Sequence, residues 1–99
     1  MKPKIYIAGK ITGDTDYRAK FEAAEQYYKK KGYTVLNPSI LPEGMLAADY
    51  MKVCFAMIDI SDAVAFLPDF WRSAGARLEY DYCLYTDKSI HHYAEEEKL

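Results

Sequence analysis

The chain has 99 residues and a formal net charge of −2, with 51% hydrophobic and 28% charged residues. This length supports one hydrophobic core and excludes two independent domains. Ten tyrosines, four phenylalanines and one tryptophan exclude intrinsic disorder for the body of the chain. The slight negative charge excludes the basic surface of a general DNA or RNA binder, so we expect no nucleic-acid partner.

The cysteine and hydropathy patterns favour a cytoplasmic protein. Cys54 and Cys83 lie inside apolar segments without further ligands at metal-binding spacing, so we expect two free, buried thiols and neither metal nor cofactor. His91 and His92 are consecutive residues of an expected strand, so they point to opposite faces and do not chelate one ion. No apolar run approaches the roughly 18 residues of a membrane span, and a signal-peptide core is not expected.

The first third of the chain predicts a strand, a helix and a second strand. Residues 5–8 form a short apolar run ended by Gly9, which favours a buried strand. A helix is expected to end at Gly32 and to be followed by a strand over residues 33–36. The apolar face of this helix has regular spacing through Tyr17, Phe21, Ala24 and Tyr28.

The rest of the chain continues the alternation. A second helix is predicted from apolar residues at steps of four and three, namely Leu46, Tyr50, Val53, Met57 and Ile60. Residues 63–67 contain no polar side chain and favour a strand covered on both faces. Ser73 is a candidate N-cap of a third helix running to about residue 85, and a fourth strand is expected near residues 89–92. We expect one domain over residues 1–93 and a frayed, charged tail over residues 94–99.

This order predicts the α/β class, as a small three-layer, flavodoxin- or Rossmann-like parallel sheet of about four strands with helices on both faces. We expect the strand order 2-1-3-4. The first and third strands are then neighbours, and the connection reverses direction between them. Such folds bind ligands beyond the C-terminal ends of these strands, where residues 9–16 and 68–75 meet.

The first of these loops contains Gly9, Lys10, Thr12 and Gly13. Glycines let the backbone approach a ligand closely, and the N-terminus of the following helix offers free N–H groups to an anion. Lys10 and Thr12 add a positive charge and a hydroxyl group. The spacing matches neither of the common phosphate-binding glycine motifs, and a plain turn between strand and helix explains the glycines equally well.

The second loop contains Asp69, Phe70 and Trp71, and Ser73 and Gly75 follow at the start of the third helix. Two adjacent aromatic side chains are costly to leave in water, so they pack against a partner or stack on a flat ligand such as a nucleobase. A hydrophobic lid or a dimer contact is the alternative to ligand stacking.

Two carboxylates near the expected site are candidates for chemistry. Glu79 falls in the second turn of the third helix among apolar residues, and a charged, desolvated carboxylate is a good nucleophile toward an electrophilic carbon. Asp62 immediately precedes the third strand and is a candidate general acid, helix cap or solvated residue. An ordinary surface position remains the alternative for Glu79.

Taken in order, these residues resemble the nucleoside 2-deoxyribosyltransferase-like superfamily, over roughly residues 4 to 85. The segments that carry the resemblance are residues 5–9, 11–13, 32–38 and 62–67, followed by Trp71, residues 73–76 and Glu79. The resemblance is closest to small bacterial and phage members of that superfamily.

The resemblance implies chemistry at the N-glycosidic bond of a nucleoside or nucleotide. Glu79 corresponds to the glutamate that attacks the anomeric carbon and displaces the base, and Tyr6 corresponds to the tyrosine that positions it. A serine at the position of Ser73 resembles the nucleotide N-hydrolase branch, where it helps to hold a 5′-phosphate. The resemblance also implies a homodimer or larger homo-oligomer and a small-molecule nucleoside or nucleotide as the binding partner.

One position departs from the resemblance. Cys54 stands where the family usually carries an acid, and a thiol does not replace a carboxylic acid as a proton donor. Asp49 and Asp59 are candidate substitutes. A non-catalytic nucleotide-binding module of the same fold is therefore the alternative to an enzyme.

Overall fold

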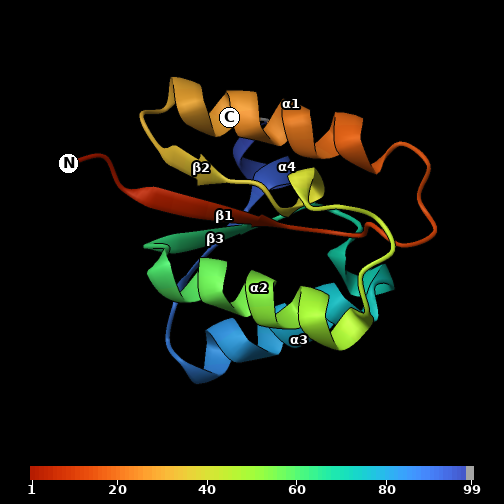
Figure 1. The fold of residues 1–99 in the computed structure, drawn as a ribbon. Coiled ribbons are helices and arrows are strands. Elements are labelled where there is room, and N and C mark those ends of the chain that lie inside the picture. The colour runs from red at the N-terminus through yellow and green to blue at the C-terminus, as the bar shows by residue number, and fades with distance from the viewer. Residues whose placement is uncertain (98–99) are drawn as a thin grey trace.

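The computed structural model describes residues 1–97, in which a four-stranded parallel sheet is covered by helices on both faces (Figure 1). The strands are β1 (Lys4–Ala8), β2 (Thr34–Leu36), β3 (Ala63–Phe66) and β4 (Ser89–His92). Their order is β2-β1-β3-β4, and every neighbouring pair is parallel. The predicted fold class and strand order are confirmed.

The helices are α1 (Tyr17–Lys30), α2 (Ala47–Ile60), α3 (Ala74–Tyr85) and α4 (Tyr93–Glu97), with two short 3₁₀ helices, η1 (Pro38–Ile40) and η2 (Phe70–Arg72). Helices α1 and α4 lie on one side of the sheet, and α2 and α3 lie on the other (Figure 1). Within residues 1–97 no helix has both the length and the apolar character that crossing a bilayer requires.

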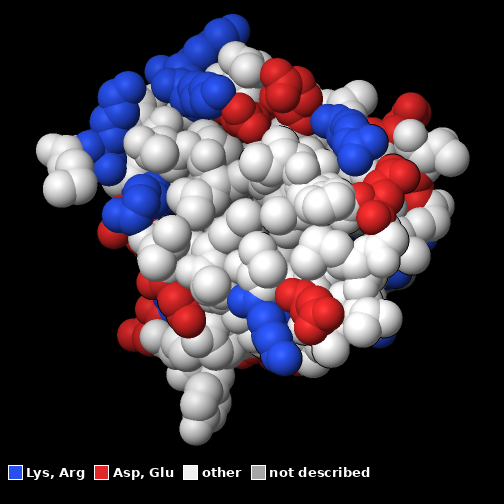
Figure 2. All heavy atoms as spheres, in the orientation of Figure 1, with Lys and Arg blue, Asp and Glu red and all other residues white. Residues whose placement is uncertain are grey.

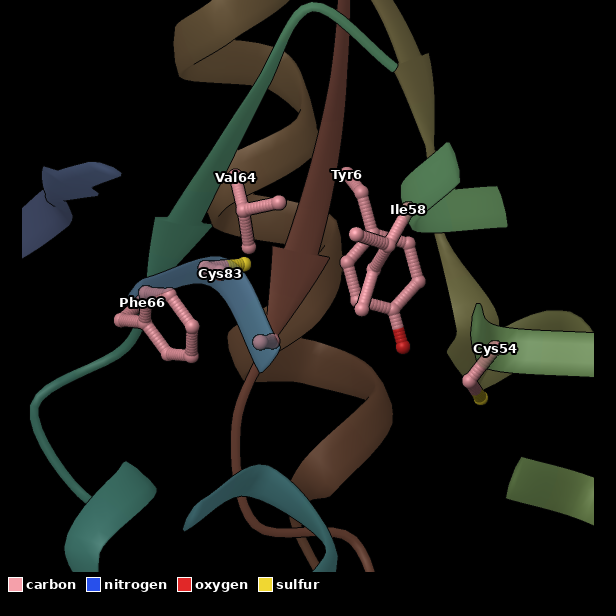
Figure 3. Packing of buried hydrophobic residues seen from close by; sticks show 7 residues of the cluster. Tyr6, Cys54, Ile58, Val64, Phe66 and Cys83 are labelled. Carbon is pink, nitrogen blue, oxygen red and sulfur yellow. The ribbon is translucent and has the colours of Figure 1, made fainter. Parts of the chain in front are cut away.

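The pleat of the strands divides the core between these two layers. Ile5 of β1 and Ala65 of β3 pack with Tyr28 of α1, whereas Tyr6 and Val64 pack toward α2 and α3. Figure 3 shows the second cluster, in which the Tyr6 hydroxyl points along the direction of β1, on the side of Cys54. Alternate residues of a strand therefore serve different layers, and even-numbered residues of β1 face the helices that build the site.

The predicted helix ends are confirmed by local geometry. Gly32 has a φ of +98° just after α1, a conformation that a side chain would disfavour. The Ser73 hydroxyl accepts a hydrogen bond of 3.2 Å from the Ala76 N–H and caps α3. The start of α3 is thereby fixed, which sets the position of every later residue of that helix.

The predicted face of α2 is wrong at its two ends, because Leu46 and Ile60 are 72% and 58% exposed. Tyr50 and Met57 do pack against the core, but the fully buried residues of the helix are Cys54 and Ile58, which the prediction left out. Apolar residues surround most of α2 because it packs against both the sheet and α3, where Phe55 stacks on Tyr82 with ring centroids 4.7 Å apart. A periodic pattern does not fix the buried face of a helix that is apolar on several sides.

The frayed tail is also corrected, because residues 93–97 form α4. Tyr28 donates a hydrogen bond of 2.8 Å to Glu96, and His91 contacts the same carboxylate. These contacts hold the helix against α1 and the sheet. Lys98 and Leu99, the end of the expected tail, lie outside the described residues.

The ends of β1 and β3 come close together at Gly9. The Leu67 N–H donates to the Ala8 carbonyl at 2.8 Å, and a Cβ atom added to Gly9 would lie 2.8 Å from the Leu67 Cδ1 atom and 3.0 Å from its Cβ atom. Glycine is required here by this close approach. The chain leaves the sheet at Gly9, on the way to the cavity described below.

Replacing Gly9 with alanine is therefore expected to destabilise the fold by about 1–3 kcal/mol, because the added methyl overpacks against Leu67. The measurement is the urea unfolding midpoint. Gly75→Ala is the matched control, since its methyl meets the flexible Met51 thioether at 3.3 Å and the loss should be smaller. Equal midpoints for Gly9→Ala and the parent protein would contradict the close approach.

Candidate active site

A cavity of about 890 Å³ opens where β1 and β2 end. Its walls come from three stretches of chain, within residues 9–17, 38–51 and 73–79, and Tyr6 contributes from β1. Figure 1 shows the loop after β1 and the segment before α2 at the same end of the sheet. The cavity therefore lies at the edge where the topology predicts a ligand.

The floor of the cavity holds a buried pair of polar side chains. Tyr6 is 1% exposed and Glu79 is 5% exposed, and the Tyr6 hydroxyl donates a hydrogen bond of 2.5 Å to Glu79 Oε2. The two residues come from the middle of β1 and the second turn of α3, and they are 73 residues apart in the chain. Glu79 is thus a buried residue of the cavity floor and not a surface glutamate.

The Glu79 carboxyl is close to half ionised at neutral pH. Burial raises its pKa from the ordinary 4.5 to about 7, while the Tyr6 hydroxyl and the neighbouring Cys54 thiol act in the opposite direction. Burial together with the Glu79 charge holds the Tyr6 pKa well above its usual value, so this hydroxyl remains a donor. A carboxyl with a pKa near 7 in a cavity is a frequent mark of a functional site.

Cys54 of α2 lies behind the floor, outside the cavity lining. It is fully buried near Glu79 and Tyr6, and burial raises the pKa of its thiol to about 11. The thiol therefore stays protonated and uncharged. Tyr50, one turn earlier in α2, lines the same cavity.

One rim of the cavity is held by a cluster of charged groups. Asp69 accepts a hydrogen bond of 3.1 Å from the Lys10 N–H and forms an ion pair with Lys20. Lys20 also pairs with Asp14, and together with the Asp16 N–H it lowers the pKa of Asp14. The cluster joins the loop after β3 to the loop after β1, which fixes the backbone between Gly9 and Gly13.

The opposite rim is the segment between β2 and α2. Glu43 accepts a hydrogen bond of 3.0 Å from the Tyr17 hydroxyl and lies 3.5 Å from an Arg18 guanidinium nitrogen. Arg18 also donates to the Ser39 carbonyl at 3.4 Å. These contacts tie the segment to the start of α1, across the mouth of the cavity.

The protein-family model described as a domain of unknown function, DUF4406, matches residues 3–92. The chain belongs to the DUF4406 family. The matched region contains the whole cavity lining, including the Tyr6–Glu79 pair, and it also contains Cys54. No curated protein matches the chain.

The structure of this DUF4406 domain brings seven of the expected site residues to one cavity. They are Tyr6, Gly9, Thr12, Gly13, Ser73, Gly75 and Glu79. Lys10 and Asp69 do not line the cavity, because they take part in the rim contacts that hold the first loop in place. Asp69 therefore supports the site from outside and is not a binding residue of this cavity.

Asp62 is not brought to the site. It lies at the start of β3, where its carboxylate accepts a hydrogen bond of 2.7 Å from the Lys4 N–H. Lys4 begins β1, so this contact is at the edge of the sheet where strands start, and the cavity is at the edge where they end. A catalytic role for Asp62 in this cavity is thus corrected to a structural contact.

The expected aromatic cover over a base is also corrected. Phe70 packs on Phe66 and stacks on Tyr80, at centroid distances of 5.1 Å and 5.0 Å, on the side of the sheet edge formed by β4. Trp71 is 55% exposed and lies under the Arg72 guanidinium, outside the cavity lining. Neither ring therefore lines the cavity that contains Glu79.

Sequence reasoning missed the third wall, formed by residues 38–47 with Tyr50 and Met51 of α2. The signal was present in the topology. Pro38 follows β2, and β2 pairs with β1, so the two strands end at the same edge. Applying the rule for carboxyl ends of strands to β2 as well would have included this segment.

The raised pKa of Glu79 predicts how stability depends on pH. Between about pH 4.5 and 7 the unfolded chain has lost this proton while the folded protein keeps it, so stability falls as pH rises through this window. A shift of this size corresponds to about 3 kcal/mol. Glu79→Gln has no such proton, and its stability relative to the parent protein should rise across the same window.

The measurement is urea unfolding of both proteins at several pH values from 4 to about 8. Parallel stability curves for the parent protein and Glu79→Gln would show that the carboxyl titrates at its ordinary pKa in the fold.

Proposed function

We propose that this DUF4406 protein cleaves or transfers at the N-glycosidic bond of a nucleoside or nucleoside 5′-monophosphate, with Glu79 as the nucleophile. The observation that carries the proposal is the buried Tyr6–Glu79 hydrogen bond on the floor of a cavity large enough for such a ligand. The resemblance to the nucleoside 2-deoxyribosyltransferase-like superfamily points to the same two residues.

The geometry leaves one oxygen of Glu79 available to attack the anomeric carbon. Tyr6 binds Oε2, and among the described residues no hydrogen bond involves Oε1. A hydrogen bond that stays on one oxygen fixes the rotation of the carboxylate and offsets part of the rise in pKa that burial causes, so that the ionised nucleophile is available near neutral pH. Tyr6 is therefore the residue that orients the nucleophile.

The proposed reaction has two steps with balanced atoms and charges. In the first step Glu79 Oε1 forms a bond to the anomeric carbon, and the bond to the base nitrogen breaks with its electron pair passing to the base, which takes up a proton from water and leaves hydroxide. In the second step the oxygen of water, or the nitrogen of another base, attacks the anomeric carbon and releases the Glu79 carboxylate, and the proton that the attacking group loses neutralises the hydroxide. Two displacements retain the configuration at that carbon.

The charges around the cavity favour a nucleoside over its 5′-monophosphate. No lysine or arginine belongs to the cavity lining that the structure describes, whereas Asp14, Glu43 and Glu79 do. The first N–H groups of α3 are the feature that favours an anion, because Ala74 and Gly75 lie at its N-terminus in the cavity wall. The described lining therefore offers no cationic side chain to balance the two negative charges of a phosphate dianion.

A nucleoside-binding module without catalysis is the second candidate function, and Cys54 is the observation in its favour. Its thiol has a pKa of about 11 at the place where the resemblance expects an acid. Asp59 does not replace that acid, since it accepts a hydrogen bond of 2.6 Å from Tyr82 and does not line the cavity. Asp49 is likewise outside the lining.

Replacing Glu79 with glutamine tests the enzyme directly. The amide keeps the shape and an acceptor for Tyr6, but it does not form the glycosyl ester, so base release should fall by at least a hundredfold while nucleoside binding survives. The parent protein should gain activity as pH rises through about 7, because the nucleophile is the ionised carboxylate. Chromatography of released bases measures both effects.

Glu22→Gln is the matched control, because Glu22 is an exposed glutamate of α1 whose carboxylate accepts a hydrogen bond from Gln26. It should turn over like the parent protein. Base release by Glu79→Gln at the parental rate would remove Glu79 from the mechanism, and tight nucleoside binding without any base release would favour the binding module.

The choice between nucleoside and nucleotide is tested by thermal protection. At equal concentration a 2′-deoxynucleoside should raise the unfolding temperature at least as much as its 5′-monophosphate, because the cavity lacks a cationic side chain. Stronger protection by the monophosphate would instead assign the phosphate to the N-terminus of α3 beside Ser73.

A further inference from the structure

One tyrosine hydroxyl in the structure is left without a partner. The Tyr50 Oη atom is buried, and it is the one buried side-chain oxygen or nitrogen of residues 1–97 that makes no hydrogen bond. The Cys54 thiol is near enough to add to the effect of burial on the Tyr50 pKa, yet the hydroxyl has no hydrogen-bond partner. A buried hydroxyl without a partner loses its hydration and gains nothing in exchange, so such groups in a folded protein call for an explanation.

The other tyrosine hydroxyls that form side-chain hydrogen bonds show what is unusual about Tyr50. Each of them donates to a carboxylate, in the pairs Tyr6–Glu79, Tyr17–Glu43, Tyr28–Glu96, Tyr82–Asp59 and Tyr93–Glu97. This chain therefore supplies tyrosine hydroxyls with strong acceptors at several places. Tyr50 has none, although it stands in the wall of the cavity that contains Glu79.

The position of the Tyr50 hydroxyl connects it with the proposed reaction at Glu79. Tyr50 and Glu79 line the same cavity, and they are near enough for the Glu79 charge to raise the Tyr50 pKa in addition to burial. The hydroxyl is thus neutral at every physiological pH, and it offers one donor and one acceptor to a ligand.

The wall around Tyr50 is mostly apolar. Leu41 and Met45 come from the segment before α2, and Met51 follows Tyr50 in the helix. Methionine side chains adapt to flat rings and make favourable sulfur–aromatic contacts. Glu43 brings the one charge of this segment, and its carboxylate is already engaged by Tyr17 and Arg18.

We propose that Tyr50 recognises the ligand's planar, uncharged heterocyclic ring, with its hydroxyl bonded to a polar atom on the ring edge and Leu41, Met45 and Met51 packed against the ring face. The inference rests on the proposed function, in which that ring is the base and Glu79 meets the sugar. In this inference the base is recognised by α2 and the segment before it, and not by Phe70 and Trp71 as the sequence predicted.

The test is Tyr50→Phe, which removes only the hydroxyl. Binding is measured by calorimetry in the Glu79→Gln background, where turnover does not interfere, with the four common 2′-deoxynucleosides as probes. Loss of one hydrogen bond should weaken the best-bound probe about tenfold, which corresponds to about 1.4 kcal/mol. The affinities for the four nucleosides should also become more similar, since the hydrogen bond to the edge of one base is lost.

A stability measurement separates recognition from a packing role. Because the hydroxyl has no partner in the free protein, Tyr50→Phe should leave the urea midpoint unchanged or raise it. Tyr82→Phe is the matched control, because Tyr82 lies outside the cavity lining and donates a hydrogen bond of 2.6 Å to Asp59. It should leave probe affinity unchanged and lower the midpoint or leave it unaltered.

The outcomes distinguish this inference from the proposed function. Unchanged affinity and unchanged base preference in Tyr50→Phe would overturn the role of Tyr50, whether or not Glu79→Gln has lost base release. If the unsubstituted protein binds none of the four probes, the proposed function fails and the role of Tyr50 in base recognition is overturned with it. A tenfold loss confined to particular bases supports the inference even if the protein proves to be a binding module.

Discussion

The hydrogen bond between Tyr6 and Glu79 is the constraint on which the site depends. A carboxyl group removed from water needs a donor, and here the donor comes from the middle of the sheet while the carboxyl comes from α3. The pair therefore fixes how α3 sits on the sheet. Ser73 caps this helix six residues earlier, so the register of the helix and the aim of Glu79 are set by the same short stretch of chain.

The arrangement opposes local stability and favours reactivity. Burial holds the pKa of Glu79 near 7, which means that the ionised form is disfavoured in the fold, and an apolar residue packed there would avoid this cost. Proteins keep such groups where chemistry requires them. The face in Figure 2 has an uncharged centre, with acidic and basic side chains arranged around it and several basic ones gathered at the upper left.

Sequence reasoning succeeded where one local signal determined the outcome, and failed where packing between elements decided. Alternating strands and helices gave the strand order, and Ser73 and Gly32 marked helix ends, because each depends on nearby backbone chemistry. The buried face of α2 and the direction of Phe70 depend on contacts with α3 and β4. The position of Glu79 was found from its apolar neighbours, but its partner Tyr6 came from the resemblance alone.

The same reasoning explains why the third wall of the cavity was the hardest part to foresee. Residues 38–47 carry few groups with chemistry of their own, so a search for reactive side chains passes over them. Their role follows from position, because β2 lies next to β1 and both strands end at the cavity. The two sides of the site are built differently: Tyr6 and Glu79 are held by a strand and a helix, while an apolar segment tied to α1 by Glu43 forms the facing wall. A substitution in this third wall therefore alters the shape of the cavity without disturbing the buried pair that fixes α3 on the sheet.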